Sequence, residues 1–482
     1  MNVLAQIGGP VSALGVFGLL LGRRRIERLL ALLTIACGAA LVFSPLMPSV
    51  SSPLRGAAIA AGIVAVVALA RGLWRWPWLL PVLTLAFVPA RLPIRMGGSS
   101  YNLLVPLYVV IAAAVLVLVY ELVRGDKRYR ELGAIAWPLA AFVAWSSISI
   151  AWSMDIHEGA IELDAFLLPF TLLALALARF RWSRRVLRAL LVELVVMALA
   201  FAVIGIYQSA TRTTFLNPRL WVSNAYTSFF RVNSVFWDPS IYGRFLVVAI
   251  LACLVVVLTR SKRPWPAVAT AAIVVLWIGL LLSFSQSSFA ALLAGVMAAA
   301  LVTWRRRAAF SLAIAAVLVA GIGLATPQIR ARVFDRTKGG LNRITSDRFA
   351  LVRHGVRIAV DHPVAGVGIG GFKRAYANLT GLSNRALRKA ASHTTPVTVA
   401  AETGIAGLAL YVWVISVALI GMYQRARPSL SGRTELVCAL VLTAIVVHSL
   451  FYAGFFEDPM VWGLLAMATG VPLALSSGTP GD

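Results

Sequence analysis

Residues 241–283 read IYGRFLVVAILACLVVVLTRSKRPWPAVATAAIVVLWIGLLLS, two apolar runs of about 19 residues on either side of one basic cluster. A helix of about 20 apolar residues crosses a hydrocarbon core of roughly 30 Å. Because a chain in lipid must satisfy its own backbone hydrogen bonds, such runs form helices rather than open strands. The stretch therefore predicts two transmembrane helices joined by a short basic turn.

The same pattern recurs along the whole chain. The expected spans are 3–21, 29–47, 54–71, 76–90, 103–122, 133–151, 161–179, 187–207, 241–259, 265–283, 287–304, 308–325, 398–422, 436–453 and 459–476. The run at 76–90 is short and rich in proline, so we expect about 12–15 spans. The predicted fold class is all-α, a polytopic transmembrane helical bundle with a large extracytoplasmic loop that contains short helices.

The composition supports a membrane protein and argues against a nucleic-acid-binding one. Hydrophobic residues make up 60% of the chain and charged residues 13%, against about 25% charged residues in soluble domains. The net charge is +26, and much of the positive charge lies in short clusters directly after apolar runs. All three cysteines (Cys37, Cys253 and Cys438) lie within apolar runs, so we expect neither a disulfide framework nor a metal site.

The basic clusters also predict the orientation. They follow alternate spans, as at Arg124–Arg130, Arg181–Arg188 and Arg305–Arg307, and the positive-inside rule assigns them to the cytoplasm. The first run precedes its arginines, the opposite of a cleavable signal peptide. We expect a multi-pass protein of the inner or plasma cell membrane, with its N-terminus outside and its C-terminus in the cytoplasm.

Two outside connections are long, at 208–240 and 326–397. The second contains thirteen arginines and lysines against three aspartates. A solvated loop is one interpretation, and a pocket for a polyanion such as a diphosphate lipid headgroup is the other. The expected organisation is residues 1–80 as additional N-terminal spans, 81–325 as a transmembrane core with the outer loop 208–240, 326–397 as the catalytic loop, and 398–482 as C-terminal spans.

Within the long loop, Thr345-Ser346-Asp347 predicts the start of a helix that runs to about Val360. Apolar residues near helical spacing form one face of it: Phe349, Val352, Val356 and Ala359. Arg353 and Arg357 lie on another face. Since arginine grips phosphate with two parallel donors, they are candidate substrate-binding residues, although a plain amphipathic cover helix is the alternative.

Further candidates follow this helix. Gly366 and Gly368 belong to a tight turn that could approach phosphate or lipid, and Lys373 and Arg374 come directly after it. His393 precedes the span that begins near Val397, where a histidine could act as a base or simply cap the interface. Glu402 lies slightly inside the apolar run, and an ionisable group there is a functional candidate, with structural pairing to an arginine as the competitor.

These residues resemble a known family. Ser346-Asp-Arg-Phe, His362-Pro-Val-Ala-Gly-Val-Gly-Ile-Gly-Gly-Phe372 and Ser392-His393…Glu402-Thr-Gly-Ile-Ala-Gly-Leu408 are similar to signatures of the O-antigen ligase and Wzy polymerase family. Trp152-Ser-Met-Asp155 and Arg231…Phe236-Trp-Asp-Pro239 resemble weaker patterns of the same family.

The resemblance implies transfer of a glycan from an undecaprenyl-diphosphate carrier to a glycan or lipid acceptor, without metal or cofactor. It implies that Arg348 and His393 are catalytic. Members often show Ser-Arg-Gly in one turn between spans, whereas this chain has Ser285-Gln286-Ser287, so we transfer that arginine's role to Arg231. Either His393 or Glu402 would take the proton of the acceptor hydroxyl.

Three alternatives stay open from the sequence. A metal-dependent polyprenyl-phosphate glycosyltransferase would need an acidic pair in the first outside loop, and residues 48–53 contain no acid. A transporter or flippase would favour inverted repeats, and none is evident. Ligase and polymerase share the signatures and differ in the acceptor, which the sequence does not identify.

Overall fold

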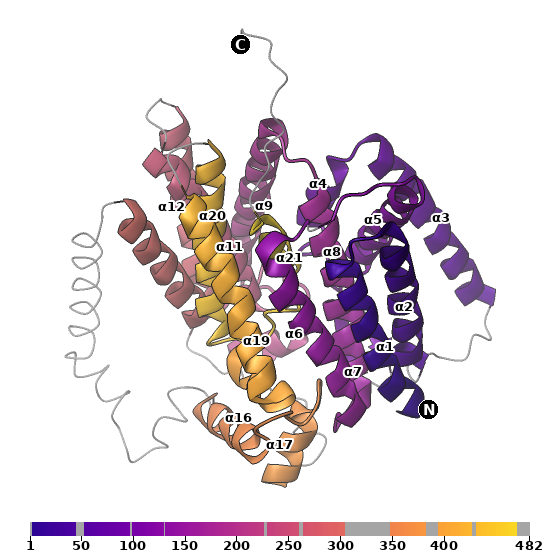
Figure 1. Cartoon of the computed structure of the whole chain (residues 1–482). Coiled ribbons are helices and arrows are strands. Elements are labelled where there is room, and N and C mark those ends of the chain that lie inside the picture. The colour runs from indigo at the N-terminus through magenta and orange to yellow at the C-terminus, as the bar shows by residue number, and fades with distance from the viewer. Residues whose placement is uncertain are drawn as a thin grey trace, which may run out of the picture.

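The computed structural model describes residues 2–44, 53–96, 99–129, 131–225, 229–259, 264–303, 348–381, 394–426 and 430–469. Within these ranges, eleven helices are long and apolar enough to cross a membrane. They lie side by side in one bundle (Figure 1). The predicted all-α polytopic membrane fold is therefore confirmed.

The first half of the bundle consists of spans joined by short turns. Its helices are α1 (Asn2–Leu21), α2 (Arg25–Phe43), α3 (Pro53–Arg75), α4 (Leu79–Ala86), α5 (Val105–Val123), the 3-10 helix η2 (Gly133–Ile135), α6 (Ala136–Ile148), the 3-10 helix η3 (Ser149–Trp152), α7 (Ile156–Ile161), the π-helix η4 (Glu162–Leu167) and α8 (Leu168–Arg179). From Ile156 to Arg179 the chain forms one membrane-crossing helix with a π-helical middle.

The second half begins with α9 (Arg184–Thr211), α10 (Pro218–Ala225), α11 (Pro239–Thr259), α12 (Trp265–Ser283) and an apolar helix at Gln286–Thr303. It continues with α16 (Arg348–Asp361), α17 (Phe372–Thr380), α19 (Thr395–Arg425), α20 (Leu430–Ser449) and α21 (Pro459–Met467). The predicted span at 308–325 lies outside the described residues.

The predicted span at 76–90 is wrong as a single transmembrane helix. Its helix, α4, has eight residues and is about 12 Å long, too short to cross a bilayer. An antiparallel hairpin of β1 (Leu92–Met96) and β2 (Ser99–Leu103) follows, with Leu92 opposite Leu103. Pro77 lies just before this helix and Pro89 just after it, and since proline does not continue a helix the apolar run contains only a short one.

Two short helices cover one end of the bundle. The segment 348–381, made of α16, a glycine-rich turn and α17, is called the cap, and the end that it covers is called the cap face. Figure 1 shows the cap in orange below α19, at the same end of the bundle as the start of α1. The opposite end is called the far face.

A buried ion cluster joins the connections at the far face. Arg28 on α2 is 1% exposed, and its Nη1 donates to the Glu131 carboxylate at 2.7 Å and to the Arg128 carbonyl at 2.7 Å. Arg179 at the end of α8 also binds Glu131. Because the cluster joins α2, α8 and the segment after α5, it fixes the N-terminal helices to the rest of the bundle.

We predict that Glu131→Gln destabilises the protein. The substitution leaves two buried guanidinium groups without their shared carboxylate, which costs about 3–5 kcal/mol when one partner of a buried pair is removed. The readout is the midpoint of thermal unfolding in detergent. The matched control is Glu27→Gln, which removes an exposed ion pair with Arg24 and should cost at most about 1 kcal/mol. Equal decreases of the unfolding midpoint in the two variants would show that the buried cluster contributes no more to stability than an exposed ion pair.

Candidate functional site

The site is organised around a break in α19. Gly404 has φ 69° and ψ −170°, which no residue of a regular helix adopts. A Cβ at this position would lie 2.0 Å from the Val364 carbonyl oxygen, so only glycine fits. In a regular helix each carbonyl accepts a hydrogen bond from the amide four residues later, and the break removes these amides from the carbonyls just before Gly404. An unpaired backbone group in an apolar environment costs free energy.

The cap supplies the missing partners. The amide of Val367 donates to the Ala401 carbonyl at 2.9 Å, and the amide of Gly368 donates to the Glu402 carbonyl at 2.8 Å. The glycine-rich turn thus inserts its backbone into the gap in α19. Docking of the cap and the break in the helix depend on each other.

Two more backbone groups at the break are paired. The indole N–H of Trp145 on α6 donates to the Thr403 carbonyl at 2.8 Å. The amide of Ile405 donates to the Pro363 carbonyl of the cap at 2.8 Å. The break in α19 is therefore bound to the cap through three backbone hydrogen bonds and to α6 through one.

The other side of the glycine-rich turn packs on residues 153–154, directly after η3. Ser153 donates its hydroxyl to the Ile369 carbonyl at 2.7 Å, and the Met154 amide donates to the Val367 carbonyl at 3.0 Å. A Cβ at Gly368, where φ is 83°, would lie 2.3 Å from the Ser153 Cα. The turn is therefore held between two transmembrane elements.

These contacts define what Gly366 and Gly368 do in this structure. The amide of Gly366 donates to the His362 carbonyl at 3.1 Å, and that of Gly368 is used by Glu402. Neither amide is left for a phosphate. We assign both glycines to close backbone packing, and the hypothesis that the turn contacts substrate through these amides has no support from the geometry.

The helix predicted from the N-cap signal is α16, which ends at Asp361 as expected. Its packed face is centred on Gly355 and Ile358, and a Cβ at Gly355 would lie 2.6 Å from the Val397 side chain. Of the apolar face predicted for this helix, Ala359 packs against the buried residues that α16, α17 and α19 share, whereas Val356 is 46% exposed. Arg353 and Arg357 are exposed, and Arg357 pairs with Asp361 at 3.8 Å.

A pocket of about 390 Å³ opens between the cap and the bundle. Its walls come from the β-hairpin, α6, the α7–η4 segment, the start of α11, the cap, α19 and the connection between α20 and α21. Among the described residues, five carboxylates and two cations line it. They are Glu158, Glu162, Asp238, Glu402, Glu457, Arg91 and Lys373.

Glu402 is the most tightly positioned of these acids. Its side chain is 6% exposed, and its Oε1 accepts a hydrogen bond from the Phe372 amide at 3.2 Å. Phe372 is the first residue of α17, so the carboxylate lies at a helix N-terminus, where the helix dipole favours negative charge. Glu402 thus lines the pocket and binds the cap.

Lys373 links the cap to the opposite wall. Its Nζ lies 3.0 Å from Glu158 Oε2, while Tyr101 of the hairpin donates to Glu158 Oε1 at 3.0 Å. Burial alone would lower the pKa of the Lys373 ammonium, but the carboxylates of Glu158, Glu162 and Glu457 outweigh burial and raise this pKa above its ordinary value. Lys373 therefore stays charged across the physiological pH range.

The structure brings only part of the predicted site together. Glu402 and Lys373 line the pocket, whereas Arg374 is exposed and lies outside its lining. Arg348 is the first residue of α16, but its side chain lies outside the described part, as does the whole of His393. Arg231 also lies outside the pocket lining, with its Nε donating to the Ser283 carbonyl at 3.2 Å.

Sequence reasoning missed five charged residues of the pocket as candidates: Arg91, Glu158, Glu162, Asp238 and Glu457. Glu158 follows the Trp152–Asp155 pattern closely and Asp238 lies within the Arg231–Pro239 pattern, and these were the available signals. Its partner Lys373 is 215 residues away in the chain, and no local pattern connects the two. Arg91 donates to the Glu457 carbonyl at 2.7 Å, again between distant segments.

The fold and the pocket together define a class: a multi-pass membrane protein with a carboxylate-lined pocket under a cap at one membrane face. A protein-family model described as O-antigen ligase matches residues 271–412, from within α12 through the cap to the first half of α19. This match supports the resemblance of the chain to the O-antigen ligase and Wzy polymerase family. No curated protein matches the chain.

We predict that Gly366→Ala loosens the cap. A Cβ there would lie 2.3 Å from the Glu402 carbonyl carbon, at a backbone φ of 67°. Hydrogen–deuterium exchange of α16 and α17 should therefore rise. Gly381→Ala is the matched control, because it has the same φ of 67° with nothing within 4 Å. Equal exchange in the two variants would mean that backbone strain alone, and not the contact with α19, controls the cap.

Proposed function

We propose that the protein transfers a glycan from an undecaprenyl-diphosphate carrier to a glycan or lipid acceptor, at the cap face of the cell membrane. The observation that carries the proposal is the buried Glu402 carboxylate in the wall of the pocket beneath the cap. The O-antigen ligase match supports a glycan transferase of this type. With the predicted orientation, the cap face is the outer face.

The pocket suits the sugar end of the reaction. Carboxylates accept hydrogen bonds from sugar hydroxyls, and the pocket has more carboxylates than cations. The Glu158–Lys373 pair holds one wall in a fixed arrangement. We therefore place the donor sugar next to the diphosphate and the attacking acceptor hydroxyl here, with Glu402 as the base and His393 as the alternative base.

The cap suits the diphosphate end. Arg353 and Arg357 are exposed on α16, and Arg348 begins that helix. Lys373 and Arg374 follow on α17. Fixed guanidinium groups around a leaving diphosphate stabilise the charge that develops in the transition state more than the charge of the ground state. Arg348 is the residue that the family resemblance singles out for this role.

Arg231 extends this arrangement. Its Nε donates to the Ser283 carbonyl, directly before the turn Ser285-Gln286-Ser287, where many family members have an arginine. The Arg231 side chain therefore lies beside the turn that lacks the expected cation. This contact supports the transfer of that role to Arg231.

The proposed reaction is one displacement. The acceptor hydroxyl oxygen forms a bond to the anomeric carbon, and its proton passes to the base. The bond between that carbon and the phosphate oxygen breaks, and the electron pair leaves with the diphosphate carrier. A good leaving group removes the need for a protein nucleophile, and the arginines supply the positive charge, so we propose a metal-independent reaction.

We predict that Glu402→Gln lowers transfer by about 10²–10⁴-fold, the usual contribution of a general base. The assay incubates purified protein with undecaprenyl-diphosphate oligosaccharide and an acceptor, and resolves products on a gel. Asp361→Asn is the matched control, since Asp361 is an exposed cap carboxylate outside the pocket. Full activity of a folded Glu402→Gln protein would overturn the role of Glu402.

We also predict that Arg348→Ala lowers transfer by about 10²–10³-fold, as for loss of one charge-stabilising donor, while expression is unchanged. Activity should persist with chelator present. Loss of activity in His393→Ala, with activity kept in Glu402→Gln, would assign the base to His393 instead of Glu402. A ladder of products would identify a polymerase, and a single transfer a ligase. Accumulation of substrate in sealed vesicles without any covalent product would instead favour transport.

A further inference from the structure

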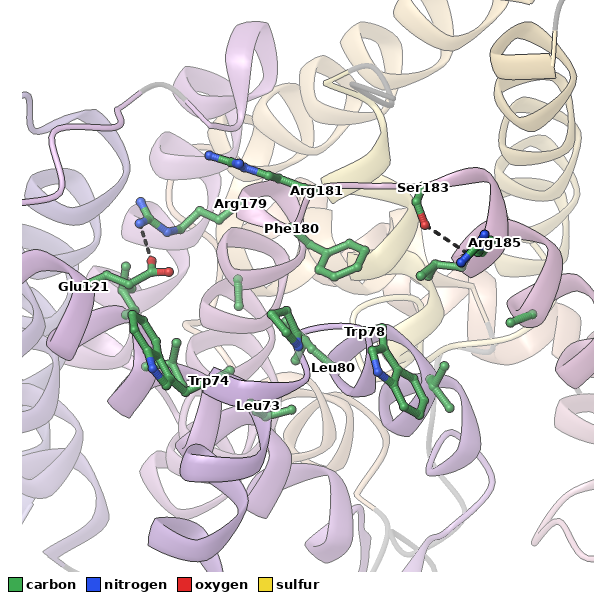
Figure 2. A pocket seen from close by; sticks show the side chains of 18 of the residues that line it. Leu73, Trp74, Trp78, Leu80, Glu121, Arg179, Phe180, Arg181, Ser183 and Arg185 are labelled. Atoms are coloured by element: carbon green, nitrogen blue, oxygen red, sulfur yellow. Dashed lines mark hydrogen bonds and ion pairs between the residues drawn. The ribbon is translucent and has the colours of Figure 1, made fainter. Parts of the chain in front are cut away.

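A second cavity lies at the far face, away from the cap. It is a groove of about 1140 Å³ between the α3–α5 region and the α8–α9 region (Figure 2). None of its lining residues belongs to the pocket beneath the cap. The glycan-transfer reaction proposed above leaves this groove without a role.

The walls of the groove are apolar and aromatic. Figure 2 shows Trp74, Trp78 and Phe180 along it, with Leu73 and Leu80 beside them. Trp74 and Trp78 are 49% and 47% exposed. Tryptophan at such half-exposed positions is typical of the level where lipid headgroups meet acyl chains. The groove therefore opens at the membrane interface and continues toward the hydrocarbon.

The rim of the groove is basic. Arg128 and Arg179 also line it, but Glu121 and Asp126 neutralise them, with Arg179 Nη2 at 2.6 Å from Glu121. Arg181 and Arg185 form no ion pair within the part of the chain that the structure describes. The rim thus carries two cations, Arg181 and Arg185, that lack a counter-ion among the described residues.

The start of α9 increases this excess of positive potential. Its first turn contains Arg184 and Arg185 and no acidic residue. Cations at a helix N-terminus are unfavourable, because the helix dipole is positive there. An anion bound between the rim and this helix end would relieve that repulsion.

One acid lies deeper in the groove. Glu193 is nine residues beyond the start of α9, about 14 Å along the helix. Its Oε2 is buried, and within the described residues it has no hydrogen-bond partner. A protonated carboxyl at this depth can donate to an ester carbonyl, which lies between the headgroup and the acyl chains of a phospholipid.

We propose that the groove binds an anionic phospholipid. Its phosphate lies against Arg181 and Arg185, its ester region reaches Glu193, and its acyl chains run along Trp74, Trp78 and Phe180. A free phosphate would leave the apolar walls exposed, and a zwitterionic lipid would leave the two arginines partly uncompensated. The site is separate from the pocket beneath the cap, so it stands or falls independently of glycan transfer.

Native mass spectrometry of the full chain tests this, with phosphatidylglycerol and phosphatidylcholine of the same acyl chains added to delipidated protein. We expect one tightly bound phosphatidylglycerol. Arg181→Gln/Arg185→Gln should weaken it about 30-fold, from about fivefold for each interfacial arginine. Arg23→Gln/Arg24→Gln, two exposed arginines at the same face but outside the groove, is the matched control and should leave binding unchanged.

Three further variants, at Ala189 and Glu193, test the acyl-chain and ester regions of the groove. Ala189→Trp places a large side chain at an exposed position of the groove and keeps every charge, so it should displace the lipid. Glu193→Leu should weaken binding more than Glu193→Gln, which keeps a donor. Equal loss in the Arg23/Arg24 control, equal binding of phosphatidylcholine, or displacement by soluble glycerophosphoglycerol would each overturn the proposal.

Discussion

The structure depends on one backbone constraint, the break in α19 at Gly404. A broken transmembrane helix exposes carbonyl and amide groups that lipid cannot satisfy, so another part of the protein must pair with them. The glycine-rich turn of the cap does so through Val367 and Gly368. This pairing places α16 and α17 at the cap face, and it places Glu402, next to the break, at the N-terminus of α17.

Acidic and basic side chains lie on different sides of the contact between the cap and α19. The pocket between cap and bundle is lined mainly by carboxylates, while the arginines of α16 are exposed on the cap. A lipid-linked glycan has a matching division, with hydroxyl-rich sugar on one side of the bond that breaks and diphosphate on the other. The far face shows a different pattern, in which a buried ion cluster fixes the N-terminal helices next to a groove with an unneutralised basic rim.

The sequence predicted what local pattern controls. Apolar length predicted the spans, and the pattern of the long loop predicted the helix α16 with an end near Val360, one residue before its observed end at Asp361. The prediction from apolar length failed at 76–90. There the apolar run is continuous, but prolines limit the helix within it to eight residues. The sequence identified Glu402, because a buried acid stands out in a span, and missed Glu158, because its partner Lys373 is 215 residues away. The packed face of α16 was equally hidden, since Gly355 is buried only by contact with α19.

The central claim is that the lipid-linked glycan binds where the cap meets the break in α19. The most direct measurement is photo-crosslinking with an undecaprenyl-diphosphate oligosaccharide that carries a diazirine on the sugar attached to the diphosphate, followed by peptide mapping. The account predicts labelling of peptides from α17, from the first turns of α19 and from the α7–η4 segment. Labelling confined to the far-face groove, or spread evenly over the lipid-facing helices, would contradict it.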